Sequence, residues 1–169
     1  MDDPDTAVFE RLLASVDHPM FMLTARDGDR RVGCLAAFAT RASIHPPRFL
    51  ILVPKQDRAQ QIATSAPVVV VHVLRAGDGD MATRFAEPSS DDLDPFEELT
   101  VLDGPAQTPV VVGLDWFAGR VLRSFDTGDH VALLLAPHDG SAARASEPSL
   151  TTHGDGGMVD GGIEPEHRE

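Results

Sequence analysis

Cysteine is almost absent from this chain of 169 residues, since Cys34 is the only one. A single thiol excludes an internal disulfide framework and a zinc site built on cysteines. Long apolar runs are missing as well: no stretch reaches the about eighteen residues that a membrane-spanning helix needs. Histidine does not replace the missing ligands, because His45, His72 and His130 lack the spacing of a metal site. We therefore predict no metal centre and no membrane span.

Positive charge is also scarce. The chain has 14 Lys and Arg against 27 Asp and Glu, which gives a net charge of −13. Nucleic-acid binding needs a basic surface, so no nucleic-acid partner is predicted. Seven of the twelve cations before residue 139 nevertheless fall between Arg26 and Arg58. This concentration has two interpretations, a local site for an anion or ordinary surface ion pairs, of which the second is the commoner.

The beginning of the chain lacks the pattern of a secretory signal. It reads Met-Asp-Asp-Pro-Asp, which is acidic, whereas a secretory signal starts basic and then turns apolar. A cytoplasmic protein is the simplest expectation.

No Gly-x-Gly-x-x-Gly motif follows a predicted strand, which disfavours a Rossmann dinucleotide cradle. Apolar and β-branched runs instead predict strands at 20–24, 31–39, 49–53, 68–74, 110–112, 114–122 and 130–135. Helices are expected at 6–16, 57–65, 81–85 and 94–99. Because strands and helices do not alternate strictly, the pattern favours a mainly β fold, an antiparallel barrel with a few short helices.

The two ends of the chain carry opposite signals. The first helix places Val8, Leu12, Leu13 and Val16 on one face, which is typical of a helix that packs. From Asp139 onward large apolar residues are few, and seven acids stand against two arginines. Such a segment cannot offset the entropy cost of ordering. We therefore expect one domain at 1–138 and an acidic tail at 139–169 that is disordered or lies loosely on a partner.

The stretch from Gly33 to Pro47 is the most informative for function. Its small residues Ala36, Ala37 and Ala39 would let a flat ligand approach the backbone closely. Hydroxyl and guanidinium groups follow where the strand is expected to give way to a loop, at Thr40, Arg41 and Ser43. Two further cations, Lys55 and Arg58, come after the next strand, where a helix is expected to start. Such groups suit a phosphate. The alternative is a plain edge strand that ends in a proline-rich loop.

This stretch resembles the flavin-binding segment of the flavin reductase-like, FMN-binding split-barrel family. The usual pattern there, Gly-Met-Thr-Ala-Ser-Ser-Phe-Thr-Ser-Val-Ser-Leu-Asp-Pro-Pro, aligns without a gap with Gly-Cys-Leu-Ala-Ala-Phe-Ala-Thr-Arg-Ala-Ser-Ile-His-Pro-Pro. Phe-Ala at 85–86 and Gly-Asp-His at 128–130 match later motifs in the same order. The resemblance covers residues 18–137.

The resemblance implies a Greek-key split β-barrel that forms a homodimer with FMN at the subunit interface. It places the flavin ring on Leu35, Ala36, Ala37, Phe38 and Ala39, and the phosphate near Thr40, Ser43, Lys55 and Arg58. His130 would stand beside the ring as the catalytic residue. Phe85 is expected first in the core and second against the ring. The implied activity is NAD(P)H:flavin oxidoreductase, with NADH or NADPH as the reductant and a monooxygenase as a possible recipient of the reduced flavin.

Several positions depart from the family pattern. The usual hydroxyl positions are occupied by Leu35, Ala37, Phe38 and Ala59, and each lost hydrogen bond to a flavin weakens binding by about 1 kcal/mol. Two alternatives therefore stay open. The barrel could bind flavin, deazaflavin or haem without turnover, or it could have lost its cofactor and act as a protein-interaction domain.

Overall fold

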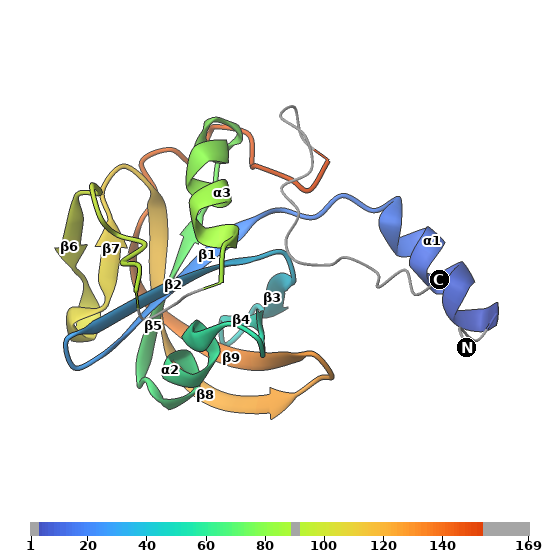
Figure 1. Cartoon of the computed structure of the whole chain (residues 1–169), viewed down its shortest axis with the longest axis horizontal. Helices are drawn as coiled ribbons and strands as arrows, with labels where there is room; N and C mark the ends of the chain where they lie inside the picture. The colour runs from blue at the N-terminus through green and yellow to red at the C-terminus, as the bar shows by residue number, and fades with distance from the viewer. Residues whose placement is uncertain (1–3, 89–91, 154–169) are drawn as a thin grey trace.

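The computed structural model describes residues 4–88 and 92–153. Seven strands form one antiparallel sheet in the order β2-β1-β5-β8-β9-β4-β3. Their bounds are β1 (Phe21–Asp27), β2 (Arg30–Ala36), β3 (Ala39–Ser43), β4 (Arg48–Pro54), β5 (Val68–Val73), β8 (Asp115–Asp126) and β9 (His130–Ser141). Figure 1 shows the sheet wrapped on itself, with helices at its ends and sides. The expected mainly β architecture with a few short helices is confirmed.

The sheet has to curl because its two edges are consecutive in the sequence. β2 lies at one edge and β3 at the other, yet only residues 37 and 38 separate them. Two residues span at most about 10 Å between the strand ends that they join. The edges are therefore brought side by side without pairing, and the barrel remains split at this point.

The barrel interior is a single apolar cluster that draws on both halves of the sheet. It contains Leu23 of β1, Ile51 of β4, Val71 of β5 and Leu135 of β9, each with no exposed surface. Helix α2 (Arg58–Ser65) contributes its buried face, including Ile62, to the same cluster. Because α2 packs on β1, β2 and β4, it covers the region where the two sheet edges approach each other.

A second apolar cluster lies outside the barrel, under helix α3 (Gly79–Ala86). Phe85 is 1% exposed and packs against Phe96 at 5.3 Å between ring centroids. Gly33 of β2 makes this packing possible, because a Cβ there would lie 2.5 Å from Cε1 of Phe85. The glycine that begins the predicted flavin segment is therefore required by the core.

A small hairpin of β6 (Val101–Asp103) and β7 (Pro109–Val111) is attached to this side of the barrel. Its anchor is His72 of β5, which is fully buried. The Nδ1–H of His72 donates to the Met22 carbonyl (3.3 Å), and its Nε2 accepts the Val111 N–H (3.1 Å). The short strand β6 was not predicted.

Helix α1 (Pro4–Ala14) stands away from the barrel, and no packed pair of elements within the described residues includes it (Figure 1). The helix itself was predicted, but its apolar face is exposed. None of the helices in the described residues has the length and apolarity to cross a membrane.

Three expectations about the chain path need correction. Residues 95–98 form turns, where a helix at 94–99 was expected. Thr40 and Ser43 belong to strand β3, where a loop was expected. The boundary at residue 138 falls inside β9, which continues to Ser141 because β8 is long enough to pair with it.

The described part of the expected tail, residues 139–153, is structured. Leu150 is buried, its N–H donates to the Leu74 carbonyl, and its carbonyl accepts from Met20 N–H. Arg144 adds ion pairs with Asp78 and Glu147. The expectation of disorder therefore does not hold for this part, because composition alone does not reveal one apolar anchor and one arginine network. Residues 154–169 lie outside the described residues.

Candidate functional site

The candidate site lies at the split between β2 and β3. Ala37 belongs to neither neighbouring ladder, since pairing with β1 ends at Ala36 and pairing with β4 begins at Ala39. The next carbonyl, of Phe38, accepts the Leu52 N–H at 2.9 Å. The backbone at Ala37 can therefore offer polar groups to a ligand without loss of a sheet hydrogen bond.

Three rings from distant parts of the chain meet beside this backbone. The Phe38 ring lies 5.2 Å from the His130 ring and 6.2 Å from the His18 ring, measured between centroids. His130 is the first residue of β9, and His18 precedes β1. The two imidazoles thus flank one aromatic ring, an arrangement suited to contact with a planar ligand.

The Gly-Asp-His turn orients His130. Gly128 has φ of +126°, a conformation that favours glycine, and its N–H donates to Asp126. The Nδ1 of His130 lies 2.6 Å from Oδ1 of Asp129. This hydrogen bond lowers the pKa of Asp129, so the carboxylate stays ionised. The ring N–H at Nδ1 is therefore held by Asp129, and Nε2 is left for other contacts.

Lys55 is tied to the same turn. Its Nζ bonds the carboxylate of Asp126 and lowers the pKa of that group, while its N–H donates to the Asp129 carbonyl at 3.0 Å. Lys55 is thus near His130, but its charge is shared with an acid at the end of β8. The anion-site interpretation of the cation cluster is weakened to that extent.

Helix α2 begins beside Lys55 and carries Arg58 in its first turn. Its N-cap is Asp57, whose Oδ1 accepts the Ala59 N–H at 2.9 Å. The sequence suggested that this helix start would offer free N–H groups to a phosphate, but the Asp57 carboxylate already uses one of them. Arg58 is the group at this helix start that suits a phosphate.

The predicted phosphate residues do not come together. Ser43 lies opposite Arg48 at the start of β4, whereas Lys55 follows its end. Lys55 is seven positions after Arg48 along the strand direction, which is roughly 23 Å. Thr40 pairs with Leu50, also far from Lys55. One phosphate cannot contact both sets, so Thr40 and Ser43 do not share a site with Lys55 and Arg58 within one copy.

Three of the predicted ring contacts are core residues. Leu35 and Ala36 are buried at the end of β2, and Leu35 packs in the cluster under α3. Phe85 is buried, as expected for a core residue, and has no surface left for a ligand. Of the predicted segment, Ala37, Phe38 and Ala39 remain half-buried, as do His130 and Arg58, whereas Lys55 is exposed.

The sequence analysis missed His18 and Asp129 as neighbours of the site. Asp129 stands within the Gly-Asp-His motif and could have been identified as a partner of His130. His18 gave no such signal, because its place depends on hydrogen bonds with Thr152, 134 residues away.

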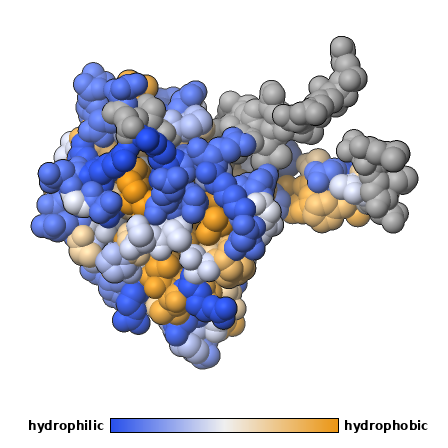
Figure 2. Space-filling model, turned by 60° about the horizontal axis from the view of Figure 1, so that its bottom comes forward, coloured by the Kyte–Doolittle hydropathy of each residue, from blue (hydrophilic) through white to orange (hydrophobic). Residues whose placement is uncertain are grey.

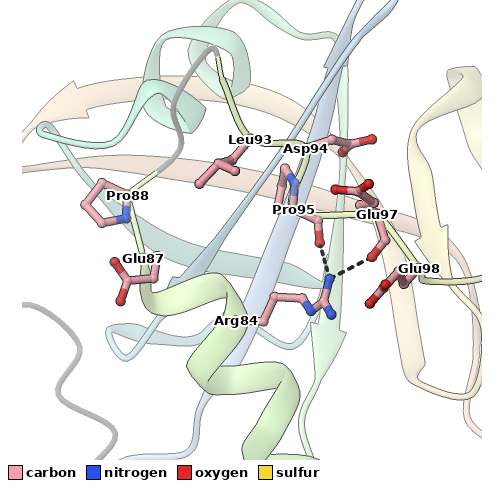
Figure 3. Close-up of a pocket in the computed structure, with 8 residues that line it drawn as sticks. All are labelled: Arg84, Glu87, Pro88, Leu93, Asp94, Pro95, Glu97 and Glu98. Carbon is pink, nitrogen blue, oxygen red and sulfur yellow. Dashed lines mark hydrogen bonds between the residues drawn. The ribbon is translucent and has the colours of Figure 1, made fainter.

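A pocket of about 370 Å³ lies elsewhere, beside the C-terminal end of α3 (Figure 3). Arg84 crosses its floor and donates to the carbonyls of Pro95 (3.3 Å) and Glu97 (2.7 Å). The remaining lining residues are mostly acidic or proline: Glu87, Pro88, Leu93, Asp94 and Glu98. No predicted site residue lines this pocket, and its acids would repel a phosphate. We therefore place the candidate site at the split.

The residues at the split fit a flavin. Ala37 and Ala39 carry only methyl groups, Ala37 has backbone groups outside both ladders, and Phe38 and His130 supply ring surfaces. A flavin has a flat ring with a polar edge, which these features suit.

Comparison with known proteins decides the family. The model of a family described as "Flavin reductase like domain" matches residues 13–160. This chain belongs to that family. The match includes residues beyond 138, in agreement with the structured segment that follows β9. The resemblance seen in the Gly33–Pro47 and Gly-Asp-His motifs is confirmed.

Relatives of this flavin reductase-like chain differ in size. It is 28% identical over 137 residues to an NADH-dependent FAD reductase of Streptomyces globisporus, covering 79% of this chain and 75% of that protein. It is 23% identical to diflavin flavoprotein A 3 of Nostoc sp. over 149 residues, which is 87% of this chain. The chain spans only 26% of the length of that flavoprotein.

Solved structures share the fold. The NADH:FAD oxidoreductase of Streptomyces globisporus superposes with a TM-score of 0.78 at 24% identity, covering 89% of this chain and 90% of that one. Nitrilotriacetate monooxygenase component B of Mycobacterium thermoresistibile gives 0.76 at 20% identity, covering 98% and 90%. The flavin reductase component of a bacterial two-component tryptophan halogenase gives 0.68 at 21%, covering 81% and 87%.

Proposed function

We propose that this chain binds FMN, reduces it with NADH or NADPH, and passes the reduced flavin to a partner monooxygenase. The observation that carries the proposal is the split itself, where Ala37–Ala39 present backbone and ring surface beside His130 in a flavin reductase-like domain. The relative named as an NADH-dependent FAD reductase supports the nicotinamide reductant. The relatives from two-component systems support an oxygenase partner.

The residues at the split would each have a separate task. A bound flavin supplies the ring that accepts a hydride from the nicotinamide. The backbone of Ala37 and Ala39 would hold the polar edge of the ring, and Phe38 would limit its position. Asp129 fixes His130 by its 2.6 Å hydrogen bond, so that the imidazole can stabilise negative charge that develops beside it. Arg58 would hold the phosphate at the start of α2.

We also propose that the chain works as a homodimer with the flavin between the copies. Support comes from α1, whose exposed apolar side chains lead directly into His18 at the site. An apolar helix that is exposed beside a candidate site is typical of an interface.

The proposal is tested by mixing the purified chain with NADH and FMN and following the loss of NADH absorbance. We expect steady oxidation that depends on added FMN, and parallel titrations with FMN, FAD and riboflavin to rank the flavins. NADPH replaces NADH in a second series to give the nicotinamide preference. Absence of FMN-dependent oxidation with both nicotinamides would contradict the proposal.

A flavin binder without turnover is the second candidate. It is favoured by the ion pair between Lys55 and Asp126 and by the lack of hydroxyl groups at 35, 37 and 38, which reduce the groups available to a cofactor. Tight uptake of FMN without oxidation of either nicotinamide would select this candidate. If no flavin binds, the interaction-only barrel is the function left.

A further inference from the structure

Helix α1 exposes an apolar face that its own barrel does not cover. The exposed fractions along this face, here called the α1 face, are 47% for Val8, 57% for Phe9, 61% for Leu12, 39% for Leu13 and 46% for Val16. Figure 2 shows the apolar helix standing apart from the barrel. A helix of 11 residues is marginal in isolation, so its amphipathic face needs a surface to pack on.

The chain that follows α1 is fixed to the barrel at residues 17 and 18. The N–H of His18 donates to Oγ1 of Thr152 (3.1 Å), and the N–H of Thr152 donates to the His18 carbonyl (2.9 Å). Asp17 accepts from the N–H of His153 at 2.9 Å. The chain therefore leaves the barrel at His18, beside Phe38, in a direction that carries α1 away from its own sheet (Figure 1).

The barrel offers a complementary surface on the outside of β4, β9 and β8. Residues paired across neighbouring strands share a face of the sheet, and the pairs Leu50–Leu134, Arg123–Leu134 and Arg120–Ala136 point away from the interior cluster. We call this surface the outer face and define it by Leu50, Leu52, Leu134, Phe125, Arg120 and Arg123. Phe125 is 45% exposed.

The charges of the two surfaces are opposite. Within the described residues, neither Arg120 nor Arg123 forms an ion pair, although the chain as a whole is strongly acidic. The segment from Met1 to the end of α1 contains Asp2, Asp3, Asp5 and Glu10 against the single cation Arg11. An acidic, apolar helix and an apolar face with two unpaired arginines are complementary in both respects.

We propose that α1 docks on the outer face of a second copy of this chain, and that α1 of the second copy docks in the same way on the outer face of the first. This inference rests on the homodimer of the proposed function and names the surfaces that form it. A two-fold axis makes the contact reciprocal, so both α1 faces and both outer faces are covered in one closed assembly. Because α1 leaves the barrel at His18, this exchange of α1 between the copies places the second barrel against the split. The second barrel then encloses the site.

The first test measures mass in solution by sedimentation equilibrium on the full chain. We expect the wild type to be a dimer and Leu12→Glu to raise the dissociation constant by roughly 100-fold, since each dimer contains two substituted anchors. Leu102→Glu is the matched control, because Leu102 has nearly the same exposure (59%) but lies on β6. Arg123→Glu should also weaken the dimer. A monomeric wild type, or a dimer unaffected by Leu12→Glu, overturns the inference.

The second test identifies the occupant of the outer face. Phe9→Cys and Phe125→Cys are made on separate chains, mixed, and treated with a short bis-maleimide; the native Cys34 is buried. Cross-linked dimer from the mixture supports exchange between copies. Cross-linked monomer from the double variant on one chain would show that α1 returns to its own barrel and would overturn it.

NADH oxidation with added FMN is measured on Leu12→Glu in parallel. Loss of NADH oxidation together with the dimer supports enclosure of the site by the second copy, whereas a monomeric variant that keeps wild-type turnover would overturn the enclosure. Flavin uptake per chain is measured on the same samples, because a wild type that dimerises through α1 but binds no flavin leaves the docking surface intact and overturns the proposed function. Failure of the docking surface and failure of the reductase therefore give different results.

Discussion

β2 and β3 are consecutive strands, joined by two residues, but they lie in opposite environments. From Val32 to Ala36, β2 is buried on both faces, between the barrel interior and the cluster under α3. No residue of β3 is fully buried. The segment that aligns with the family's flavin motif is therefore core in its first part and ligand-accessible in its second. A motif that is continuous in sequence can serve two physical purposes, and here the change occurs at Ala37.

The same contrast separates two sides of the molecule. The closed side contains β1, β2 and β5 with α3 and the β6–β7 hairpin, and most of its apolar side chains are buried. The open side contains the split, the start of α2 and the turn that carries His130. Substitutions on the closed side should change stability and leave ligand binding intact, and those on the open side should do the reverse.

Phe85→Ala should have the largest effect. Removing a buried aromatic ring costs about 3–5 kcal/mol of unfolding free energy, which urea denaturation measures. FMN affinity of the folded fraction should be unchanged, because Phe85 has 1% of its surface exposed. Leu102→Ala is the control, an exposed apolar residue of β6 (59%) whose truncation should cost far less. If Phe85→Ala weakened FMN binding at urea concentrations where the variant is still folded, Phe85 would belong to the site. The division into a closed and an open side would then be wrong.

His72 should make the closed side sensitive to acid. Burial lowers the pKa of His72 from 6.5 to about 4. Between these values the unfolded chain binds a proton at His72 that the folded chain does not, so the contribution of His72 to stability falls as pH decreases through this window and is constant above it. The full difference amounts to about 3 kcal/mol.

His72→Gln tests this pH dependence. The amide can retain both hydrogen bonds, to Met22 and Val111, without titrating. Urea unfolding at several values of pH measures the free energy of unfolding of both proteins. After the pH dependence common to both is subtracted, the wild type should lose stability in acid and the variant should not. An identical slope in the two proteins would mean that other groups cause the loss.

His130→Ala should act on the open side. The imidazole is expected to stabilise charge beside the flavin, and loss of one such contact slows hydride transfer about tenfold, equivalent to about 1.4 kcal/mol. Single-turnover mixing of NADH with the flavin-loaded protein measures this step, while FMN affinity should change less. His138→Ala is the control, since His138 is an exposed residue of the same strand. An unchanged single-turnover rate would remove His130 from the reaction.

Much of the fold was predictable because apolar periodicity and motif order are local properties. Most strands that line the interior were predicted, as were α2 and α3, but β3 was expected to be a loop. β6 was missed because three residues give little periodic signal and the strand depends on a distant contact from His72 to Val111. The extension of β9 to Ser141 was missed because its last residues are polar and are ordered by pairing with β8.

The site was only partly predictable for a related reason. Residue types marked the Gly33–Pro47 segment and the Gly-Asp-His turn, and the split brings their exposed parts together. Sequence spacing could not show that Leu35 faces the core, because this depends on α3 covering the outside of β2. Nor could it show that Ser43 and Lys55 lie at opposite ends of β4, since that follows from the strand register.

The two ends of β4 also give the finest test of the open side. If the phosphate of FMN lies at the start of α2, Arg58→Ala should weaken FMN binding about fivefold to tenfold, as expected for one charge-assisted hydrogen bond near the surface. Riboflavin, which lacks the phosphate, should bind both proteins equally. Arg48→Ala removes the same charge beside Ser43, at the other end of the strand. Because roughly 23 Å separates these ends, only one of the two substitutions can discriminate FMN from riboflavin within a single copy. Fluorescence titration of the two flavins with each variant decides which. Discrimination by Arg48→Ala alone would move the phosphate to the β3 end and restore Thr40 and Ser43 to the site.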